Sequence, residues 1–176
     1  MKFSETILAG AYIVAPEKME DERGFFARTF CREEFKERGL SSTFVQCDIS
    51  VNRKMGTLRG MHYQLPPHQE VKLVSCPRGA IYDVIIDLRR DSTTYCRWFG
   101  IELNEENCTM LYLPADFAHG FITLRDNSEV LYLMSEFYRP GSGSGCRWND
   151  PVFDIKWPVP VTVISERDRE YPDFLA

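Results

Sequence analysis

The chain has 176 residues, a formal net charge of −5, and 44% hydrophobic and 27% charged residues. This length is typical of about one domain, since domains commonly run to roughly 100–200 residues. The composition is that of a globular protein and excludes disordered and collagen-like chains. The acidic balance argues against a nucleic-acid partner, because nucleic-acid-binding surfaces normally carry a basic stripe. A few local Arg and Lys residues could still bind a small anionic substrate.

The sequence gives no sign of a membrane span or of export. It contains no run of about 18 apolar residues, so we expect no membrane partner. The apolar stretch 7–15 follows Glu5, and only Lys2 offers a positive charge, so we predict a first strand there rather than a signal peptide. The six cysteines are scattered without a C-x-x-C pair, which favours reduced thiols and a cytoplasmic location.

Further along the chain, strand patterns outnumber helical ones. Short runs rich in Val, Ile, Leu, Tyr and Phe predict strands over residues 43–50, 70–77, 80–88, 95–103, 109–113 and 129–135. Only residues 32–38 and 166–170 show a helical pattern. Residues 141–145, which alternate Gly and Ser after Pro140, are predicted to form a flexible loop.

The stretch 80–88 shows the clearest strand alternation. Its even-numbered positions are all apolar, whereas the other face contains Ile81, Asp83, Ile85 and Asp87. We therefore predict one core face and one partly polar face. Many short strands at fairly even spacing predict an all-β sandwich, jelly roll or small barrel, and such barrels commonly hold a ligand in the mouth.

Two of the three histidines lie in segments that are rich in functional side chains. His62 follows Arg59 and precedes Lys72, and His119 lies in the run 113–121. A lone histidine is commonly structural. Here Gly60 and Gly120 lie beside the two histidines, which indicates close backbone approach.

The two histidines belong to a longer pattern, which consists of Gly56, His62, Tyr63, Gln64, Glu70, Gly79, Pro114, Asp116 and His119. This pattern resembles that of the cupin, or double-stranded β-helix, family. Metal-binding cupins have a second histidine where this chain has Gln64, and Gln is a poor ligand for transition metals. A site of His62, Glu70 and His119 remains an alternative, and it would belong to a metal-dependent oxygenase.

A narrower resemblance rests on ten pieces of the chain, at residues 21–26, 44–46, 58–64, 72–74, 79–84, 87–89, 117–121, 148–151, 155–158 and 165–168. These pieces resemble, in the same order, those of the dTDP-4-dehydrorhamnose 3,5-epimerases, which act on nucleotide-linked 4-keto-6-deoxy sugars. The resemblance implies a single epimerase domain over residues 1–176, with antiparallel strands in a double-stranded β-helix and a few short helices. It also implies an isomerase without metal or other cofactor.

The reaction that this resemblance implies needs a base, an acid and an enolate stabiliser. A 4-keto group makes the hydrogens on C3 and C5 acidic, and inversion requires proton removal on one face and return on the other. The resemblance assigns the base to His62, the group that holds its imidazole to Asp168, and the acid to Tyr132. Ser165 suggests a second reading, in which Asp168 is only a residue of a capped helix N-terminus.

The resemblance also implies a set of substrate-binding residues. Arg pairs with phosphate through two hydrogen bonds and Lys acts as a point charge, so these types suit a diphosphate or an enolate. Tyr138 would pack on the nucleotide base and Gln46 would hydrogen-bond the sugar or nucleotide. The candidates for the charged end of the substrate are Arg23, Arg59, Lys72 and His119.

The same resemblance implies a homodimer that exchanges its N-terminal strands. Arg23 and Phe26 would then serve the pocket of the neighbouring subunit. Three alternatives stay open beside the two-centre epimerase: a single-centre epimerase that uses the same three catalytic residues, the metal-dependent oxygenase, and an inactive sugar-nucleotide binder. The base of the nucleotide is also open, because Cys47, Asp48 and the 141–145 loop depart from the family pattern.

Overall fold

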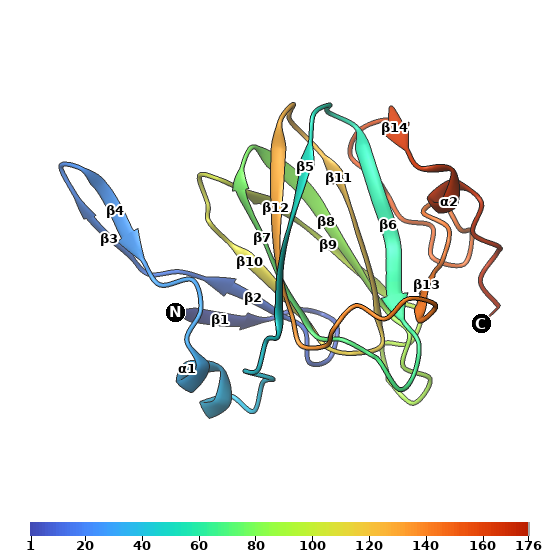
Figure 1. The fold of residues 1–176 in the computed structure, drawn as a ribbon, viewed down its shortest axis with the longest axis horizontal. Coiled ribbons are helices and arrows are strands. Elements are labelled where there is room, and N and C mark those ends of the chain that lie inside the picture. Colours follow the sequence, from blue (N-terminus) through green and yellow to red (C-terminus); the bar gives the residue numbers. More distant parts are fainter. Residues whose placement is uncertain (176) are drawn as a thin grey trace.

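The computed structural model describes residues 1–175 and contains two facing β-sheets (Figure 1). The strands in each sheet are antiparallel, except for one short parallel pair. The strands of the first sheet, in spatial order, are β1 (Lys2–Glu5), β2 (Tyr12–Ala15), β10 (Met110–Leu113), β7 (Lys72–Arg78), β12 (Ser128–Met134) and β5 (Gln46–Asn52). Those of the second are β13 (Gly143–Gly145), β6 (Thr57–Gln64), β11 (Phe117–Thr123), β8 (Ala80–Asp87) and β9 (Trp98–Asn104), with β14 (Val163–Ile164) parallel to β6.

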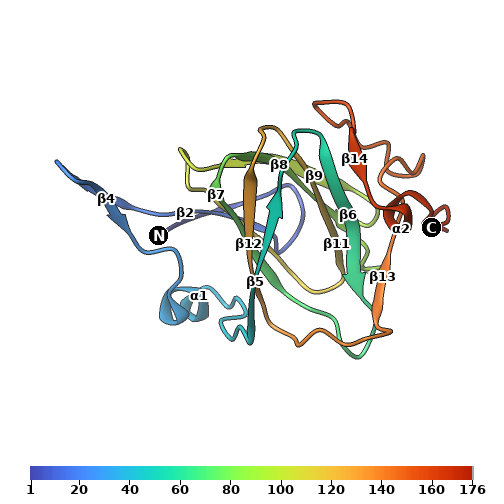
Figure 2. The same ribbon diagram turned by 45° about the horizontal axis from the view of Figure 1, so that its top comes forward.

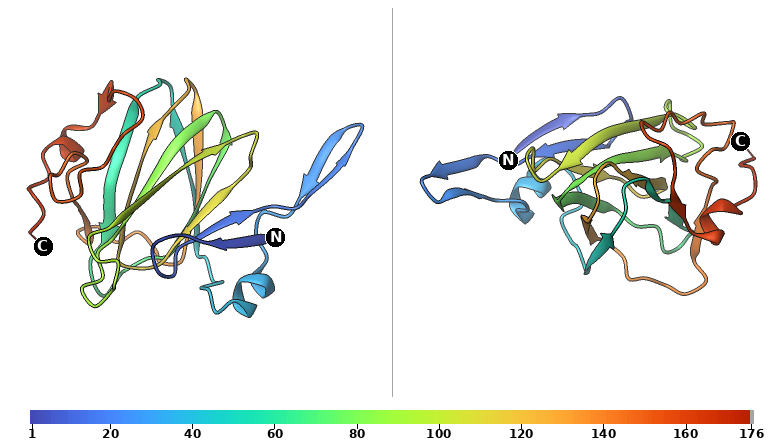
Figure 3. Two further views of the ribbon diagram at one scale, coloured as in Figure 1. Left: turned by 180° about the vertical axis from the view of Figure 1, so that it is seen from behind. Right: turned by 90° about the horizontal axis from the view of Figure 1, so that it is seen from above.

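Three smaller elements lie outside these sheets. The hairpin of β3 (Lys18–Asp21) and β4 (Gly24–Ala27) stands away from the body, which is plain from behind and from above (Figure 3). The two helices are α1 (Arg32–Glu37) and α2 (Glu166–Arg169). The all-β prediction with a few short helices is confirmed. None of the helices in residues 1–175 is long and apolar enough to cross a membrane.

The N-terminal prediction was wrong in its bounds. Residues 7–15 do not form one strand, because the chain reverses before β2. The Thr6 amide donates to the Ala11 carbonyl at 3.0 Å, and Gly10 has a φ of +84°, a conformation that glycine adopts easily. The apolar side chain of Leu8 is buried at this turn and contributes to the core without belonging to a strand.

The glycine-rich segment after Pro140 also differs from the prediction. Only its first part is a loop, since Gly143–Gly145 form β13 against β6. A Cβ atom on Gly145 would collide with the ring of Tyr171, so the absence of a side chain lets this edge strand approach its neighbours. Composition alone indicated flexibility, whereas packing at the sheet edge gives these residues a fixed register.

Strand β8 shows why the predicted division of faces was wrong. Its odd-numbered face, which was expected to be the partly polar one, points into the space between the sheets, where Ile81 and Ile85 join the apolar core. Val84 and Ile86 on the other face are covered by a second cluster that includes Phe153. Both faces are therefore buried because the C-terminal segment covers the outside of the second sheet.

The space between the sheets is divided into an apolar half and a polar half. Large apolar side chains from β8, β9, β10 and β11 fill the half near the β2 edge. Polar and charged side chains come from β5, β6, β11 and β12 in the other half. The candidate site lies in this polar half, so the apolar half serves as its rigid support.

Candidate active site

Two histidines face each other across neighbouring strands. His62 on β6 is the strand partner of His119 on β11, and partners across a ladder point to the same side of the sheet. The strands come close at Gly60 and Gly120, where a Cβ on Gly60 would lie only 2.5 Å from the Gly120 Cα. This confirms the close backbone approach predicted from the two glycines.

His62 forms a dyad with Asp168. Its Nε2 lies 2.7 Å from Asp168 Oδ1, and the backbone amide of Gly60 donates to the other carboxylate oxygen at 3.2 Å. The Asp168 side chain is buried, whereas 39% of the His62 side chain is exposed. Burial raises the pKa of Asp168, but the hydrogen bonds from His62 and Gly60 outweigh it and hold this pKa below its ordinary value. Asp168 is therefore a carboxylate at neutral pH.

Asp168 also has the helix position that Ser165 suggested. Ser165 caps α2, because its Oγ accepts a hydrogen bond from the Asp168 amide at 3.1 Å. The two readings of Asp168 are therefore compatible. The cap fixes the backbone of α2, and the side chain is left free to hold the imidazole of His62.

A second pair lies deeper in the barrel. His119 Nε2 is 2.7 Å from Oδ1 of Asp83, which is completely buried on β8. Within residues 1–175 the other oxygen, Oδ2, has no hydrogen-bond partner. Sequence reasoning noted Asp83 in an alternation pattern but gave it no role. An acidic residue in the middle of an otherwise apolar strand was the signal, because a buried carboxylate needs a partner.

Tyr132 lies against this second pair. Its ring meets that of His119 edge-on, with centroids 6.0 Å apart. Burial, and after it the negative charge of Asp83, raise the pKa of Tyr132 above its ordinary value. The phenol consequently keeps its proton at neutral pH and is able to donate it.

The cationic candidates Arg59 and Lys72 are held by polar neighbours. Arg59 donates from Nε to the Asn52 carbonyl oxygen at 2.8 Å. Lys72 is buried and lies 2.9 Å from Oε1 of Glu70, while Gln64 donates to the other oxygen of Glu70 at 3.1 Å. Lys72 is thus a buried cation and Arg59 an exposed one, and each is held by a polar neighbour.

Gln46 and Tyr138 are in direct contact. The side-chain oxygen of Gln46 accepts a hydrogen bond from the Tyr138 amide, and the Tyr138 side chain is 64% exposed. The protein itself therefore uses one acceptor position of Gln46. This contact was not foreseen from the sequence, which gave Gln46 a direct contact to ligand.

The three groups of the alternative metal site have other partners. His62 pairs with Asp168, His119 with Asp83, and Glu70 with Lys72. No cluster of three or more His, Cys, Asp or Glu side chains able to hold a metal occurs within residues 1–175. Each of the three side chains is thus already paired with another side chain of the protein.

Comparison with known proteins places this geometry in a family. Residues 5–175 match the family model of dTDP-4-dehydrorhamnose 3,5-epimerase. The dTDP-4-dehydrorhamnose 3,5-epimerase of Methanothermobacter thermautotrophicus is 43% identical over 173 residues, which is 97% of this chain and 92% of the relative. The chain belongs to the dTDP-4-dehydrorhamnose 3,5-epimerase family. It is an isomerase that acts on dTDP-linked 4-keto-6-deoxy sugars.

Solved structures of other epimerases share its fold. The dTDP-4-dehydrorhamnose 3,5-epimerase of Bacillus anthracis, with TDP and PPi bound, gives a TM-score of 0.95 at 39% identity and covers 98% of this chain and 99% of its own. A 3′-monoepimerase from Streptomyces bikiniensis in complex with dTDP-quinovose gives 0.88 at 32% identity, with 96% and 85% covered. These matches confirm the predicted cupin-type architecture.

Two predicted binding residues of the epimerase lie apart from the rest. Arg23 and Phe26 belong to the β3–β4 hairpin, which projects away from the body of its own chain (Figure 1). Within residues 1–175 the Arg23 side chain hydrogen-bonds only to Asp21 of the same hairpin, and 70% of Phe26 is exposed. The two residues do not contribute to the site of their own subunit.

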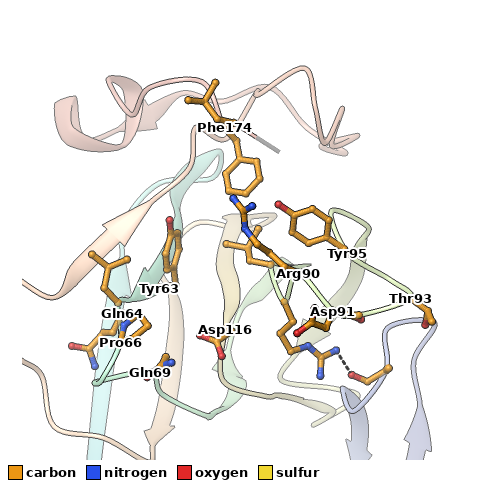
Figure 4. A pocket seen from close by; sticks show the side chains of 16 residues that line it. Tyr63, Gln64, Pro66, Gln69, Arg90, Asp91, Thr93, Tyr95, Asp116 and Phe174 are labelled. Atoms are coloured by element: carbon orange, nitrogen blue, oxygen red, sulfur yellow. Dashed lines mark hydrogen bonds between the residues drawn. The ribbon is translucent and has the colours of Figure 1, made fainter.

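One wide cleft of the epimerase is separate from this site. It has a volume of about 970 Å³ and is lined by Tyr63, Arg90, Tyr95 and Phe174, with none of the predicted site residues (Figure 4). A smaller cavity of about 410 Å³ is lined by Arg59, His62 and Asp168. Of these two hollows, only the smaller is lined by residues predicted for the site.

Proposed function

We propose that the whole chain acts as one epimerase domain that inverts both C3 and C5 of a dTDP-linked 4-keto-6-deoxyglucose, without metal or other cofactor. The observation on which the proposal rests is the 2.7 Å hydrogen bond between His62 and Asp168. It joins a partly exposed imidazole to a buried carboxylate at the edge of a polar cavity. This arrangement suits a general base that must take a proton from carbon.

His62 removes the proton in the first step. Asp168 binds one nitrogen of the imidazole and fixes the ring, so the other nitrogen can accept the proton from C3 or C5. The imidazolium that results is stabilised by the adjacent carboxylate. The electron pair of the broken C–H bond moves into the carbonyl, which gives an enolate at O4.

Lys72 and His119 are the candidates that stabilise the enolate. Lys72 lies on the inner face of β7, two residues before Val74, and Val74 is the strand partner of Tyr132. His119 lies beside Tyr132 in the same half of the barrel. A positive charge or an N–H donor aimed at the developing oxyanion lowers the barrier most in a site with little water.

Tyr132 returns the proton on the other face of the ring. Tyr132 is partly buried and its phenol is protonated. Its ring lies against His119, and His119 is the strand partner of His62. A base and an acid on different sides of the substrate are what inversion requires. The same pair can serve C3 and C5 in turn if the sugar is repositioned between the two steps.

The nucleotide part of the substrate is proposed to bind near Arg59 and Tyr138, which are exposed side chains. Arg59 is fixed by Asn52 and provides a guanidinium for the diphosphate. Tyr138 offers an exposed ring on which a base can stack. The TDP in the Bacillus anthracis structure supports a dTDP-linked substrate for this chain as well.

The active form is proposed to be a homodimer that exchanges its hairpins. The hairpin projects from its own chain and presents Phe26, Phe25 and Met19, which are at least half exposed. Apolar side chains in that position are stabilised if they pack against another surface. Seating them at the pocket of a second copy would bring Arg23 and Phe26 to the nucleotide of that copy.

The decisive experiment follows dTDP-4-keto-6-deoxyglucose in D₂O by NMR. Deuterium at both C3 and C5, together with inversion at both, is the expected result. Inversion at C3 alone would identify a single-centre enzyme like the Streptomyces bikiniensis monoepimerase. No exchange at either carbon would disprove the proposed chemistry.

A chelation arm of the same experiment tests the metal-dependent alternative. Activity is expected to survive extended dialysis against EDTA, because proton transfer by His62 and Tyr132 needs no Lewis acid. Activity that disappears with EDTA and returns with one divalent ion would support a site of His62, Glu70 and His119 instead.

A further inference from the structure

The segment that joins the two sheets at the mouth of the barrel is held by two glutamines. We call residues 135–142 the strap, because they cross from the end of β12 in one sheet to the start of β13 in the other (Figure 2). Its ends are anchored: the Ser135 amide donates to the Val71 carbonyl at 3.0 Å, and the Ser142 carbonyl accepts from the Leu65 amide at 2.8 Å. Residues 137–140 between these anchors are exposed.

Consecutive amides of the exposed part donate to glutamines from opposite sheets. The Tyr138 amide donates to Gln46, at the start of β5, and the Arg139 amide donates to Oε1 of Gln64, at the end of β6, at 3.2 Å. Gln64 is buried. A backbone amide can only donate, so both glutamines must present their oxygen to the strap.

Gln64 also reaches the floor of the site. Its Nε2 donates to Oε2 of Glu70 at 3.1 Å, and Oε1 of Glu70 binds the ammonium of Lys72 at 2.9 Å. A carboxylate can only accept, so the orientation of the Gln64 amide is fixed at both ends. One chain of hydrogen bonds therefore runs from the strap to Lys72.

We propose that Gln46 and Gln64 are positioning residues, which hold the strap so that Tyr138 is placed for the nucleotide, and that Gln64 ties the strap to Lys72 through Glu70. The proposal rests on the proposed function, in which Tyr138 contacts the nucleotide and Lys72 the enolate. It replaces a direct contact between Gln46 and the ligand by a role that acts through Tyr138. The two glutamines differ in reach, since only Gln64 contacts Glu70.

The test compares Gln46→Leu and Gln64→Leu in the full-length protein. Hydrogen exchange at the Tyr138 and Arg139 amides is expected to speed up about fivefold or more in each, the equivalent of one net hydrogen bond. KM for the dTDP-sugar is expected to rise by a similar factor. Gln64→Leu should also lower kcat about fivefold, because Lys72 loses its fixed partner, whereas for Gln46→Leu the effect falls on KM.

Matched variants separate this role from a loss of packing. Gln46→Glu keeps an acceptor for the Tyr138 amide and should retain its protection from exchange. Gln64→Glu keeps the acceptor for Arg139 but places a carboxylate against Glu70, so it should protect the amide and still lower kcat. Amides that exchange freely in the wild-type protein, or equally fast in all variants, would overturn the proposal. A wild-type protein with protected amides and no epimerase activity would count against the proposed function alone.

Discussion

Tyr132 is the side chain whose removal separates proton loss from inversion. Tyr132→Phe keeps the ring against His119 and deletes only the hydroxyl. We expect deuterium exchange at C3 or C5 to continue, because His62 can return a solvent-derived deuteron to the same face, while product formation is greatly reduced. NMR in D₂O measures both quantities in one sample.

The control for this variant is Tyr63→Phe, on the outer face of strand β6 in the second sheet. It should leave exchange and inversion in their wild-type ratio. Equal losses of both activities in Tyr132→Phe would mean that Tyr132 stabilises the enolate or holds the substrate. Full inversion would remove it from the mechanism.

His62 and Asp168 should respond to substitution as one unit. His62→Ala removes the base and is expected to lower deuterium exchange by about 10²–10⁴-fold, the usual contribution of general base catalysis. Asp168→Asn keeps the size but loses the charge that stabilises the imidazolium. Because both variants disable the same step, the double variant should be little worse than His62→Ala. Additive losses would show that the two residues act independently.

At the level of residues, the sequence was most informative where the chemistry needs particular side chains. The motif around His62 and the distant Asp168 could be matched to known proteins, and their contact is present in the structure. The partner of His119 was missed. In the sequence, Asp83 is only one polar position in the alternation of a strand. Its contact with the imidazole of His119 becomes visible only when β8 pairs with β11.

At the scale of elements, the turn after β8 is stabilised by the negative charge of one buried carboxylate, that of Asp87. Asp87 is completely buried and accepts hydrogen bonds from Arg89 at 2.7 and 2.9 Å and from Thr94 at 2.6 Å. Burial raises its pKa, but these donors outweigh it and lower the pKa from 3.8 to about 2. The carboxylate therefore stabilises the fold above about pH 4, and this contribution is lost as the pH falls toward 2.

Asp87→Asn should reveal this contribution directly. We expect a loss of about 2 kcal/mol in the free energy of unfolding at pH 7, from a shift of about two pKa units. The difference from the wild type should shrink between pH 4 and pH 2. Urea denaturation at a series of pH values measures it, with Asp91→Asn, an exposed residue of the same turn, as the control. A difference that stays constant with pH would contradict the assignment.

Element boundaries were predicted less well than element types. Strand 43–50 begins only at Gln46, and strands β6 and β11 were noticed as motifs and not as strands. The reason is physical: glycine and histidine weaken the apolar alternation in β6 and β11, although hydrogen bonding to neighbours makes them central strands. These two strands form because they pair with strands that are distant in the sequence. Such pairing cannot be recognised from a short stretch of sequence.

For the whole molecule, the proposed exchange of hairpins predicts complementation between two impaired variants. Arg23→Ala and His62→Ala should each form dimers with low activity. A mixed dimer contains one site with an intact His62 and an intact Arg23 of the partner subunit. Equilibrated equal mixtures should therefore recover about a quarter of the wild-type activity, since half of the dimers are mixed and each has one complete site.

Light scattering provides the control for the mixing experiment. Each variant should have the mass of a dimer, because neither substitution removes the apolar side chains of the hairpin. Mixtures that stay inactive although subunits exchange would show that Arg23 does not serve the neighbouring site. A fully active monomer would exclude the exchanged dimer altogether.

The dyad joins two positions that are 106 residues apart in the chain. Both histidines, Tyr132 and all the strands of the two main sheets except β13 and β14 precede residue 135. Asp168 arrives on a helix of four residues that contacts β6 near the end of the chain. During synthesis these strands are therefore complete before the proposed base, His62, can meet its carboxylate. We expect a chain clipped ahead of Ser165 to keep the strands of both sheets and to lose turnover.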